Sequence, residues 1–206
     1  MIILPLNLVH VENIHPIFES SLQSVDKEIA LNQKGLVIWM VGLSGSGKST
    51  LARGLENLLH EKGYHTMLLD GDNLRTGINN NLGFTEEDRL ENIRRAAEVS
   101  KLFAKNGTVT ICSLISPTEK IRKMASDIIG SHFWEVFVSC PIEVCEERDV
   151  KGLYAKARKG EIKNFTGIDS PFENPKAPDV IIETNKFDLE ESLDQLYNNI
   201  IDKIKR

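Results

Sequence analysis

Residues 42–49 read Gly42-Leu43-Ser44-Gly45-Ser46-Gly47-Lys48-Ser49, which matches the pattern G-x-x-x-x-G-K-[ST] at every fixed position. In this pattern the glycines let backbone N–H groups surround phosphate oxygens, the lysine reaches the β- and γ-phosphates, and the final hydroxyl binds Mg²⁺. An unbroken apolar run at residues 36–41 precedes the loop, and leucines at helical spacing follow Thr50. The order strand, loop, helix directs a helix N-terminus at an anion. We therefore expect residues 42–50 to bind a nucleoside triphosphate.

From residue 35 onward, apolar runs typical of strands alternate with amphipathic segments typical of helices. This alternation predicts an α/β fold of the P-loop NTPase type, with three α/β/α layers and a mainly parallel five-stranded sheet. The expected strands are 36–41, 65–69, 108–112, 133–138 and 180–183. The expected helices are 50–59, 86–105, 118–129, 141–148, a short one at 153–159, and a C-terminal one from Leu189 to Ile204.

The remaining segments divide the chain into an arm, a domain and a lid. Residues 1–34 are predicted to form an N-terminal arm with a short helix at 24–30, and residues 35–206 the kinase-like domain. The arm is either partly ordered, or a lid or dimer contact. Residues 73–84 are expected to be a polar loop. Residues 149–178 are expected to carry little structure, which often marks a lid over a binding site.

Composition excludes several classes of protein. The net charge of −5 over 206 residues argues against binding to a nucleic acid polymer. The three cysteines lie in apolar surroundings, so they predict a reducing compartment, here the cytoplasm, and no disulfide framework. Histidines show no metal-ligand spacing, and no apolar run approaches the roughly 20 residues that span a bilayer. Residues 1–9 lack the features of a signal peptide.

Polar residues end the predicted strands. In an open parallel sheet, ligands bind at the carboxyl ends of the strands. Asp70 and Asp72 follow the second strand, and Ser113 and Ser116 follow the third. Transfer of a phosphoryl group to an alcohol needs a base for the hydroxyl proton and a group that supports Mg²⁺, and these two carboxylates can divide those roles. The alternative is an ordinary turn.

Basic residues suggest a second anionic substrate. Arg89 and Asn92 are three residues apart and share a helix face, and with Arg75 they offer donors that suit an anion. Arg148 begins a basic stretch, residues 148–163, that can cover phosphates as a lid. The alternative for each is a solvated charged surface. Phe84 and Phe165 lie in polar loops, where they can clamp a base or simply anchor the loops.

Several blocks outside the phosphate loop resemble the adenylyl-sulfate kinases. They are Asp70-Gly71-Asp72-Asn73-Leu74-Arg75, residues 81–95, Ile115-Ser116-Pro117, residues 145–154 and residues 165–173. The resemblance implies transfer of the γ-phosphate of ATP to the 3′-hydroxyl of adenosine 5′-phosphosulfate (APS), with Mg²⁺, in sulfate assimilation.

The resemblance also implies roles for individual residues. Asp72 would be the base, and Lys48 would stabilise charge. Asp70 and Ser49 would support Mg²⁺, and Arg148 would lie near the ATP adenine. The residues that bind APS would be Arg75, Arg89, Asn92, the backbone at Ile115, Lys151 and Leu153. The adenine of APS would lie between Phe84 and Phe165.

Other expectations concern Ser116 and the assembly. Ser116 matches a serine that is described in this family as a phosphorylated intermediate. Direct transfer of the phosphoryl group from ATP to the acceptor needs no such intermediate. Family habit suggests a homodimer, and the lack of a sulfurylase domain suggests a stand-alone kinase. The chain departs from the family at Val41, at Phe172 and through residues 15–34. Two alternatives remain: a kinase for another small hydroxylated acceptor, and a nucleotide-dependent switch without acceptor chemistry.

Overall fold

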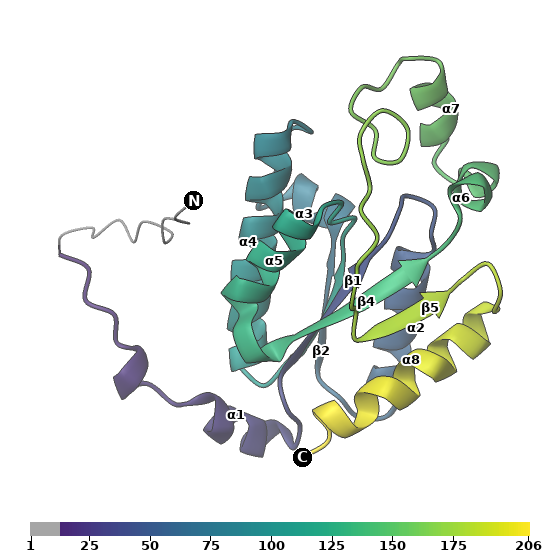
Figure 1. Cartoon of the computed structure of the whole chain (residues 1–206). Helices are drawn as coiled ribbons and strands as arrows, with labels where there is room; N and C mark the ends of the chain where they lie inside the picture. The colour runs from purple at the N-terminus through teal and green to yellow at the C-terminus, as the bar shows by residue number, and fades with distance from the viewer. Residues whose placement is uncertain (1–12) are drawn as a thin grey trace.

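The computed structural model describes residues 13–206, and a five-stranded sheet forms the centre of this part of the chain (Figure 1). All five strands are parallel, in the spatial order β2-β3-β1-β4-β5. The expectation of a mainly parallel sheet is confirmed. The strands are β1 (Leu36–Val41), β2 (Thr66–Asp70), β3 (Val109–Ser113), β4 (Phe133–Ser139) and β5 (Val180–Glu183).

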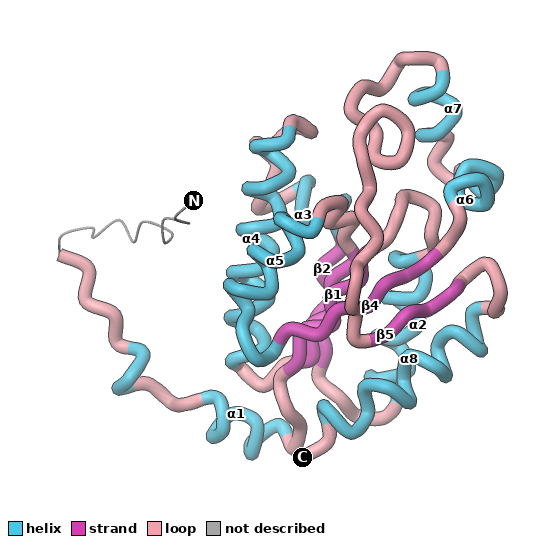
Figure 2. The backbone as a smooth tube through the Cα atoms, in the orientation of Figure 1, coloured by secondary structure: helices cyan, strands magenta, loops and turns pink. Residues whose placement is uncertain are grey.

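Helices cover both faces of the sheet, which gives the expected three layers (Figure 2). α2 (Lys48–Glu61) and α8 (Leu189–Ile204) pack on one face, and α4 (Glu86–Lys105) and α5 (Glu119–Ile129) pack on the other. The central strand β1 is buried along its whole length, so successive side chains enter opposite cores. Ile38 packs with α2 and α8, whereas Trp39 packs with α4 and α5. This double burial explains why β1 is apolar throughout rather than alternating.

One expected loop contains a helix. Residues 71–76 form α3 (Gly71–Thr76), where the Asp-Gly-Asp-Asn composition indicates only a turn. The Asp70 carboxylate caps this helix by accepting from the Asp72 N–H at 3.0 Å. Leu74 packs against the core on the α4 side of the sheet. A side-chain cap and one apolar contact thus stabilise a helix that the local sequence does not favour.

The expected lid region projects beyond the carboxyl ends of β4 and β5 (Figure 1). It follows α6 (Ile142–Arg148) and contains α7 (Leu153–Arg158), and most of its remaining residues are loop. The prediction of one short helix within 149–178 is confirmed.

The described part of the arm contains η1 (Phe18–Ser20) and α1 (Ser24–Leu31), neither of which has a buried residue. The chain joins the domain at Gln33, whose side-chain amide donates to the carbonyls of His65 at 2.9 Å and Gly107 at 2.7 Å. The expectation about a signal peptide concerns residues 1–9, which lie outside the described residues. Within residues 13–206, no helix has both the length and the apolar character needed to cross a membrane.

Candidate active site

A cavity of about 890 Å³ lies at the carboxyl ends of the strands. The phosphate loop, the capped helix α3, the start of α4 and the lid all contribute to its walls. The sequence candidates that line it are Ser44, Gly45, Gly47, Lys48, Ser49, Thr50, Asp70, Asp72, Arg75, Phe84, Arg89, Asn92, Ile115, Ser116, Arg148, Lys151, Leu153 and Phe165. The structure therefore brings together residues that the sequence separates by more than 100 positions.

Three loop candidates lie behind this wall. Leu43 is buried against Cys140, Cys145 and Tyr154, so its side chain supports the loop from behind. Gly42 and Ser46 also do not line the cavity. Any contact that these three make with a nucleotide would involve the backbone.

The phosphate loop is held by its carbonyl groups. Four successive carbonyls each accept a hydrogen bond from a side chain: Leu43 from Lys48 Nζ at 2.6 Å, Ser44 from Tyr154 Oη at 2.9 Å, Gly45 from Arg148 Nη1 at 3.4 Å and Ser46 from Thr184 Oγ1 at 2.7 Å. Across a trans peptide the C=O group and the following N–H group point in opposite directions. Because the four carbonyls point toward these side chains, the N–H groups that follow them point away from the side chains. Gly45 and Gly47, with φ of 76° and 96°, supply the left-handed backbone that the turn requires.

Lys48 is nearly buried, with 7% of its surface exposed. Burial lowers its pKa to about 8, mainly because the charged form loses solvation, while nearby carboxylates such as Asp70 oppose the shift. Its ammonium group also lies 3.4 Å from Ser46 Oγ. A partly desolvated cation on the loop is well suited to pair with an anionic phosphate.

Three oxygen-bearing side chains meet beside Lys48. Ser49 Oγ donates to Asp70 Oδ2 at 2.8 Å and lies 3.2 Å from Ser113 Oγ. Hard oxygen ligands of this kind fit Mg²⁺, which binds through one or two carboxylates together with substrate phosphates. Among residues 13–206 no group of three or more His, Cys, Asp or Glu side chains could hold a metal ion alone. Ser49, Asp70 and Ser113 offer ligands of the kind that Mg²⁺ uses together with substrate phosphates.

Asp72 also lines the cavity and is exposed. Its carboxylate forms an ion pair with Lys151, which belongs to the lid. The two residues are 79 positions apart, and both side chains are more than half exposed. An exposed carboxylate at a strand end is free to approach a hydroxyl group, and the lid lysine holds it there as an ion pair.

Arg75 and Phe84 form a second wall. The Arg75 guanidinium lies 4.3 Å from the centre of the Phe84 ring and donates to the Gly83 carbonyl at 2.8 Å. Phe84 is 61% exposed. Its other face is thus available to a flat ligand.

Arg89 joins this wall to the lid. Its guanidinium donates to the Phe84 carbonyl at 3.0 Å, to Thr166 Oγ1 at 2.6 Å and to the Asn164 carbonyl. Phe165 lies between these two lid residues and packs edge-on against Tyr154, with ring centres 5.0 Å apart. Arg89 therefore fixes the spacing of the two loops that carry Phe84 and Phe165.

Ser116 lies in the wall of the cavity and contacts two buried side chains. The residue is 1% exposed, and its hydroxyl oxygen accepts from the Trp39 indole at 3.0 Å. Its carbonyl accepts from the buried Arg122 guanidinium at 3.1 Å, and its φ of 47° is unusual for a non-glycine residue. These contacts fix Ser116 in the cavity wall, and the hypothesis that it is phosphorylated stays a prediction.

Sequence reasoning missed two residues that shape the loop. Thr184 follows the carboxyl end of β5, and the rule that ligands gather at strand ends would have indicated it. Tyr154 contacts the loop through its hydroxyl group, and nothing in its local sequence signals a partner 110 residues away.

Comparison with known proteins agrees with this geometry. The family model for adenylylsulphate kinase matches residues 34–183, which is most of the chain. The chain belongs to the adenylyl-sulfate kinase family. An adenylyl-sulfate kinase of Bacteroides thetaiotaomicron is 57% identical over 195 residues, which cover 94% of this chain and 97% of that protein.

Solved structures of adenylyl-sulfate kinases share the fold. The APS kinase of Mycobacterium tuberculosis, solved in complex with AMPPNP and APS, is 44% identical with a TM-score of 0.79, covering 82% of this chain and 98% of that one. A hexameric APS kinase from Thiobacillus denitrificans is 28% identical with a TM-score of 0.64, covering 84% of this chain and 30% of that one.

Proposed function

We propose that this member of the adenylyl-sulfate kinase family transfers the γ-phosphate of ATP to the 3′-hydroxyl of APS, giving ADP and 3′-phosphoadenosine 5′-phosphosulfate. The observation that supports it is a single cavity with two unlike walls. The donor half consists of residues 42–50 with Arg148 and Thr184. The acceptor half consists of Asp72, Arg75, Phe84, Arg89, Asn92, Lys151 and Phe165.

In the donor half, the backbone N–H groups of the loop and the Lys48 ammonium bind the triphosphate of ATP. Arg148 donates to the Thr184 carbonyl at 2.7 Å, which keeps its guanidinium beside the loop and supports a role near the ATP adenine. Ser49 and Asp70 would hold Mg²⁺, with Ser113 as a third neighbour. When bound, Mg²⁺ neutralises charge on the phosphate oxygens.

In the acceptor half, Phe84 and Phe165 bind the adenine of APS, and Arg75, Arg89 and Asn92 bind its charged part, completed by Lys151, Leu153 and the Ile115 backbone. Asp72 accepts the proton of the 3′-hydroxyl as that oxygen attacks the γ-phosphate. Its ion pair with Lys151 opens or rearranges so that one carboxylate oxygen meets the hydroxyl. The lid then covers both nucleotides and excludes water.

The test is release of ADP by the purified chain with ATP, Mg²⁺ and added APS. We expect APS to stimulate turnover strongly, and replacement of APS by a sugar acid or a nucleoside to give none. Slow turnover that APS does not change would indicate a nucleotide-dependent switch. Omission of Mg²⁺, with EDTA present, should abolish turnover, and added Mg²⁺ should restore it.

We also propose that the protein is a cytoplasmic homodimer. Its three cysteines are free and buried, which suits a reducing compartment. The described part of the arm exposes six large apolar side chains by more than half, a surface that a second copy can cover: Ile14, Ile17, Phe18, Leu22, Val25 and Ile29. Sedimentation velocity should give a dimer for the full chain and a monomer for the Ile17→Asp, Phe18→Asp double variant. A monomeric full chain would contradict this proposal.

A further inference from the structure

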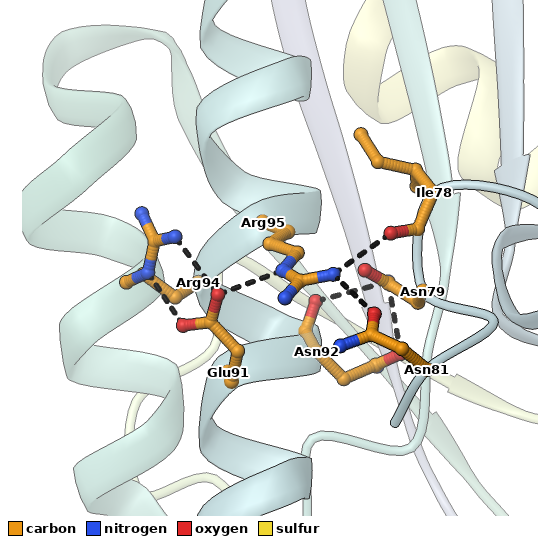
Figure 3. A network of polar contacts seen from close by, with 7 residues as sticks. All are labelled: Ile78, Asn79, Asn81, Glu91, Asn92, Arg94 and Arg95. Atoms are coloured by element: carbon orange, nitrogen blue, oxygen red, sulfur yellow. Dashed lines mark hydrogen bonds and ion pairs between the residues drawn. The ribbon is translucent and has the colours of Figure 1, made fainter. Parts of the chain in front are cut away.

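Asn79 is a buried polar residue with no role in the site as described so far. It lies in the turn after α3 and is 0% exposed. Its backbone N–H donates to the Leu74 carbonyl at 2.9 Å, and its carbonyl accepts from the Leu82 N–H at 3.0 Å. The side chain points at α4, where it meets Asn92 (Figure 3). A buried amide needs partners, so this contact has to be accounted for.

The contact fixes the orientation of both amides. Asn79 Nδ2 lies 3.5 Å from the Asn92 backbone carbonyl and 3.0 Å from Asn92 Oδ1. A backbone carbonyl can only accept, so the end of Asn79 that faces it must be the NH₂ group. The Asn92 atom that faces the same NH₂ group must then be its oxygen. Within residues 13–206, Asn79 Oδ1 is buried and has no hydrogen-bond partner, so the contact with Asn92 is what defines the orientation.

The fixed orientation of the Asn92 amide decides what it offers to the cavity. Asn92 is 6% exposed and lines the cavity three residues after Arg89. Its Oδ1 faces Asn79 and already accepts one hydrogen bond from it, whereas Nδ2 lies at the other end of the amide and can only donate. We propose that Asn79 is a positioning residue that makes Asn92 a hydrogen-bond donor toward APS. The matching group on APS is then an acceptor, either an unprotonated ring nitrogen or an oxygen. This inference rests on the proposed function.

The turn that carries Asn79 is held in place by a second contact. Arg95 donates from Nη1 to the Ile78 carbonyl at 2.9 Å and to Asn81 Oδ1 at 2.8 Å, on either side of Asn79 in sequence (Figure 3). Glu91 anchors Arg95 at 2.7 Å and also pairs with Arg94. Hydrogen bonding to Arg94 is the main reason that the pKa of Glu91 falls to about 2, so this anchor stays charged at neutral pH. The position of Asn79 is thus set independently of any ligand.

The experiment uses Asn79→Leu, which keeps the approximate shape of the side chain and removes the donor. Without the Asn79 donor, the side-chain amide of Asn92 can rotate. We therefore expect the KM for APS to rise about tenfold, which corresponds to the loss of one hydrogen bond to a polar ligand. The kcat and the KM for ATP should stay within about twofold, because the donor half is untouched. Asn80→Leu, an exposed asparagine one residue later, is the matched control and should leave all three constants unchanged.

A double-mutant cycle separates positioning from general destabilisation. In an Asn92→Ala background there is no amide to orient, so Asn79→Leu should change the KM for APS less than about twofold further. If the Asn79→Leu variant does not fold, the same kinetic constants are measured for Asn79→Ala. An unchanged KM for APS in a folded variant overturns the proposal. The proposal is also overturned if Asn79→Leu lowers the melting temperature and changes the KM for APS and the KM for ATP equally. A tenfold rise in the KM for APS when Asn79→Leu is added to Asn92→Ala overturns it as well. If the wild-type chain itself shows no APS-dependent turnover, the proposed function fails instead.

Discussion

In the proposed function, the donor half offers its ligand mainly backbone groups and the buried Lys48, whereas the acceptor half offers mainly side chains. In the loop, four consecutive carbonyls are held by other residues, and Lys48 is nearly buried. In the acceptor half, Asp72, Phe84 and Lys151 are exposed and come from three separate segments. Backbone N–H groups recognise any triphosphate. The choice of acceptor substrate therefore depends on the acceptor half, whose side chains are more exposed. Variants of the two halves should therefore differ in which kinetic constant they change.

The largest effect is expected for Lys48→Ala in the donor half. Loss of the buried cation removes charge stabilisation that grows as the phosphoryl group moves, so kcat should fall about 1,000-fold. The measurement is ADP release at saturating ATP and APS. Lys34→Ala, at an exposed lysine before β1, is the control and should retain normal turnover. A kcat within tenfold of wild type would remove Lys48 from the mechanism.

A smaller effect is expected for Asp72→Asn in the acceptor half. The amide cannot accept the hydroxyl proton, so kcat should fall about 100-fold or more. The affinity for ATP, measured by calorimetry, should stay within about twofold because Asp72 contacts Lys151 and not the phosphate loop. Asp194→Asn, at an exposed position on α8, is the control. Near-normal turnover in the Asp72 variant would show that another group is the base.

A substrate-specific effect is expected for Phe84→Ala. Loss of one stacked ring should raise the KM for APS about tenfold, and the KM for ATP should not change. The comparison variant is Phe187→Ala, because Phe187 also lines the cavity but follows Thr184 in the donor half. It should leave the KM for APS unchanged. Equal effects of both variants on APS would show that the halves are not separate.

An effect of similar size to that of Phe84→Ala is expected for the dependence of ATP binding on alkaline pH. Burial lowers the pKa of Lys48 to about 8, so the free protein loses this charge as the pH rises through that value. The affinity for ATP without APS should fall about tenfold between pH 7.5 and 9.5, as measured by calorimetry. Lys48→Arg stays charged over this range and should bind with a flat profile. The free energy of unfolding should rise with pH between about 8 and 10.5. In that range Lys48 is neutral in the folded chain but still protonated in the unfolded chain.

The sequence predicted the sheet and most of the helices because their apolar periodicity is strong. β1 and α4 begin and end where the pattern indicates. The pattern failed at α3, because its Asp-Gly-Asp-Asn composition favours a turn and only the Asp70 cap and the packing of Leu74 stabilise a helix. The phosphate loop could be predicted from its own residues because backbone recognition needs a fixed local spacing.

The acceptor half could not be predicted in the same way. Arg75 became a candidate through its charge and Phe84 through its place in a polar loop, and the resemblance then implied that both bind APS. No spacing in the sequence shows that the guanidinium lies over the ring. The buried contact between Asn79 and Asn92 depends on the turn after α3, which the pattern did not foresee. Ser116 became a candidate through its place after the third strand and through the resemblance, whereas its contact with Trp39 appears only in three dimensions.

The four held carbonyls of the phosphate loop also bear on how the chain folds during synthesis. Residues 42–49 leave the ribosome early, but two of the side chains that hold the loop lie 110 and 138 residues farther along. The loop therefore reaches its final shape only after Tyr154 and Thr184 have been translated. Contacts this distant in sequence form late and slow the folding of a domain. Nascent chains that stop before residue 184 should consequently have no nucleotide affinity, although they contain the entire loop motif.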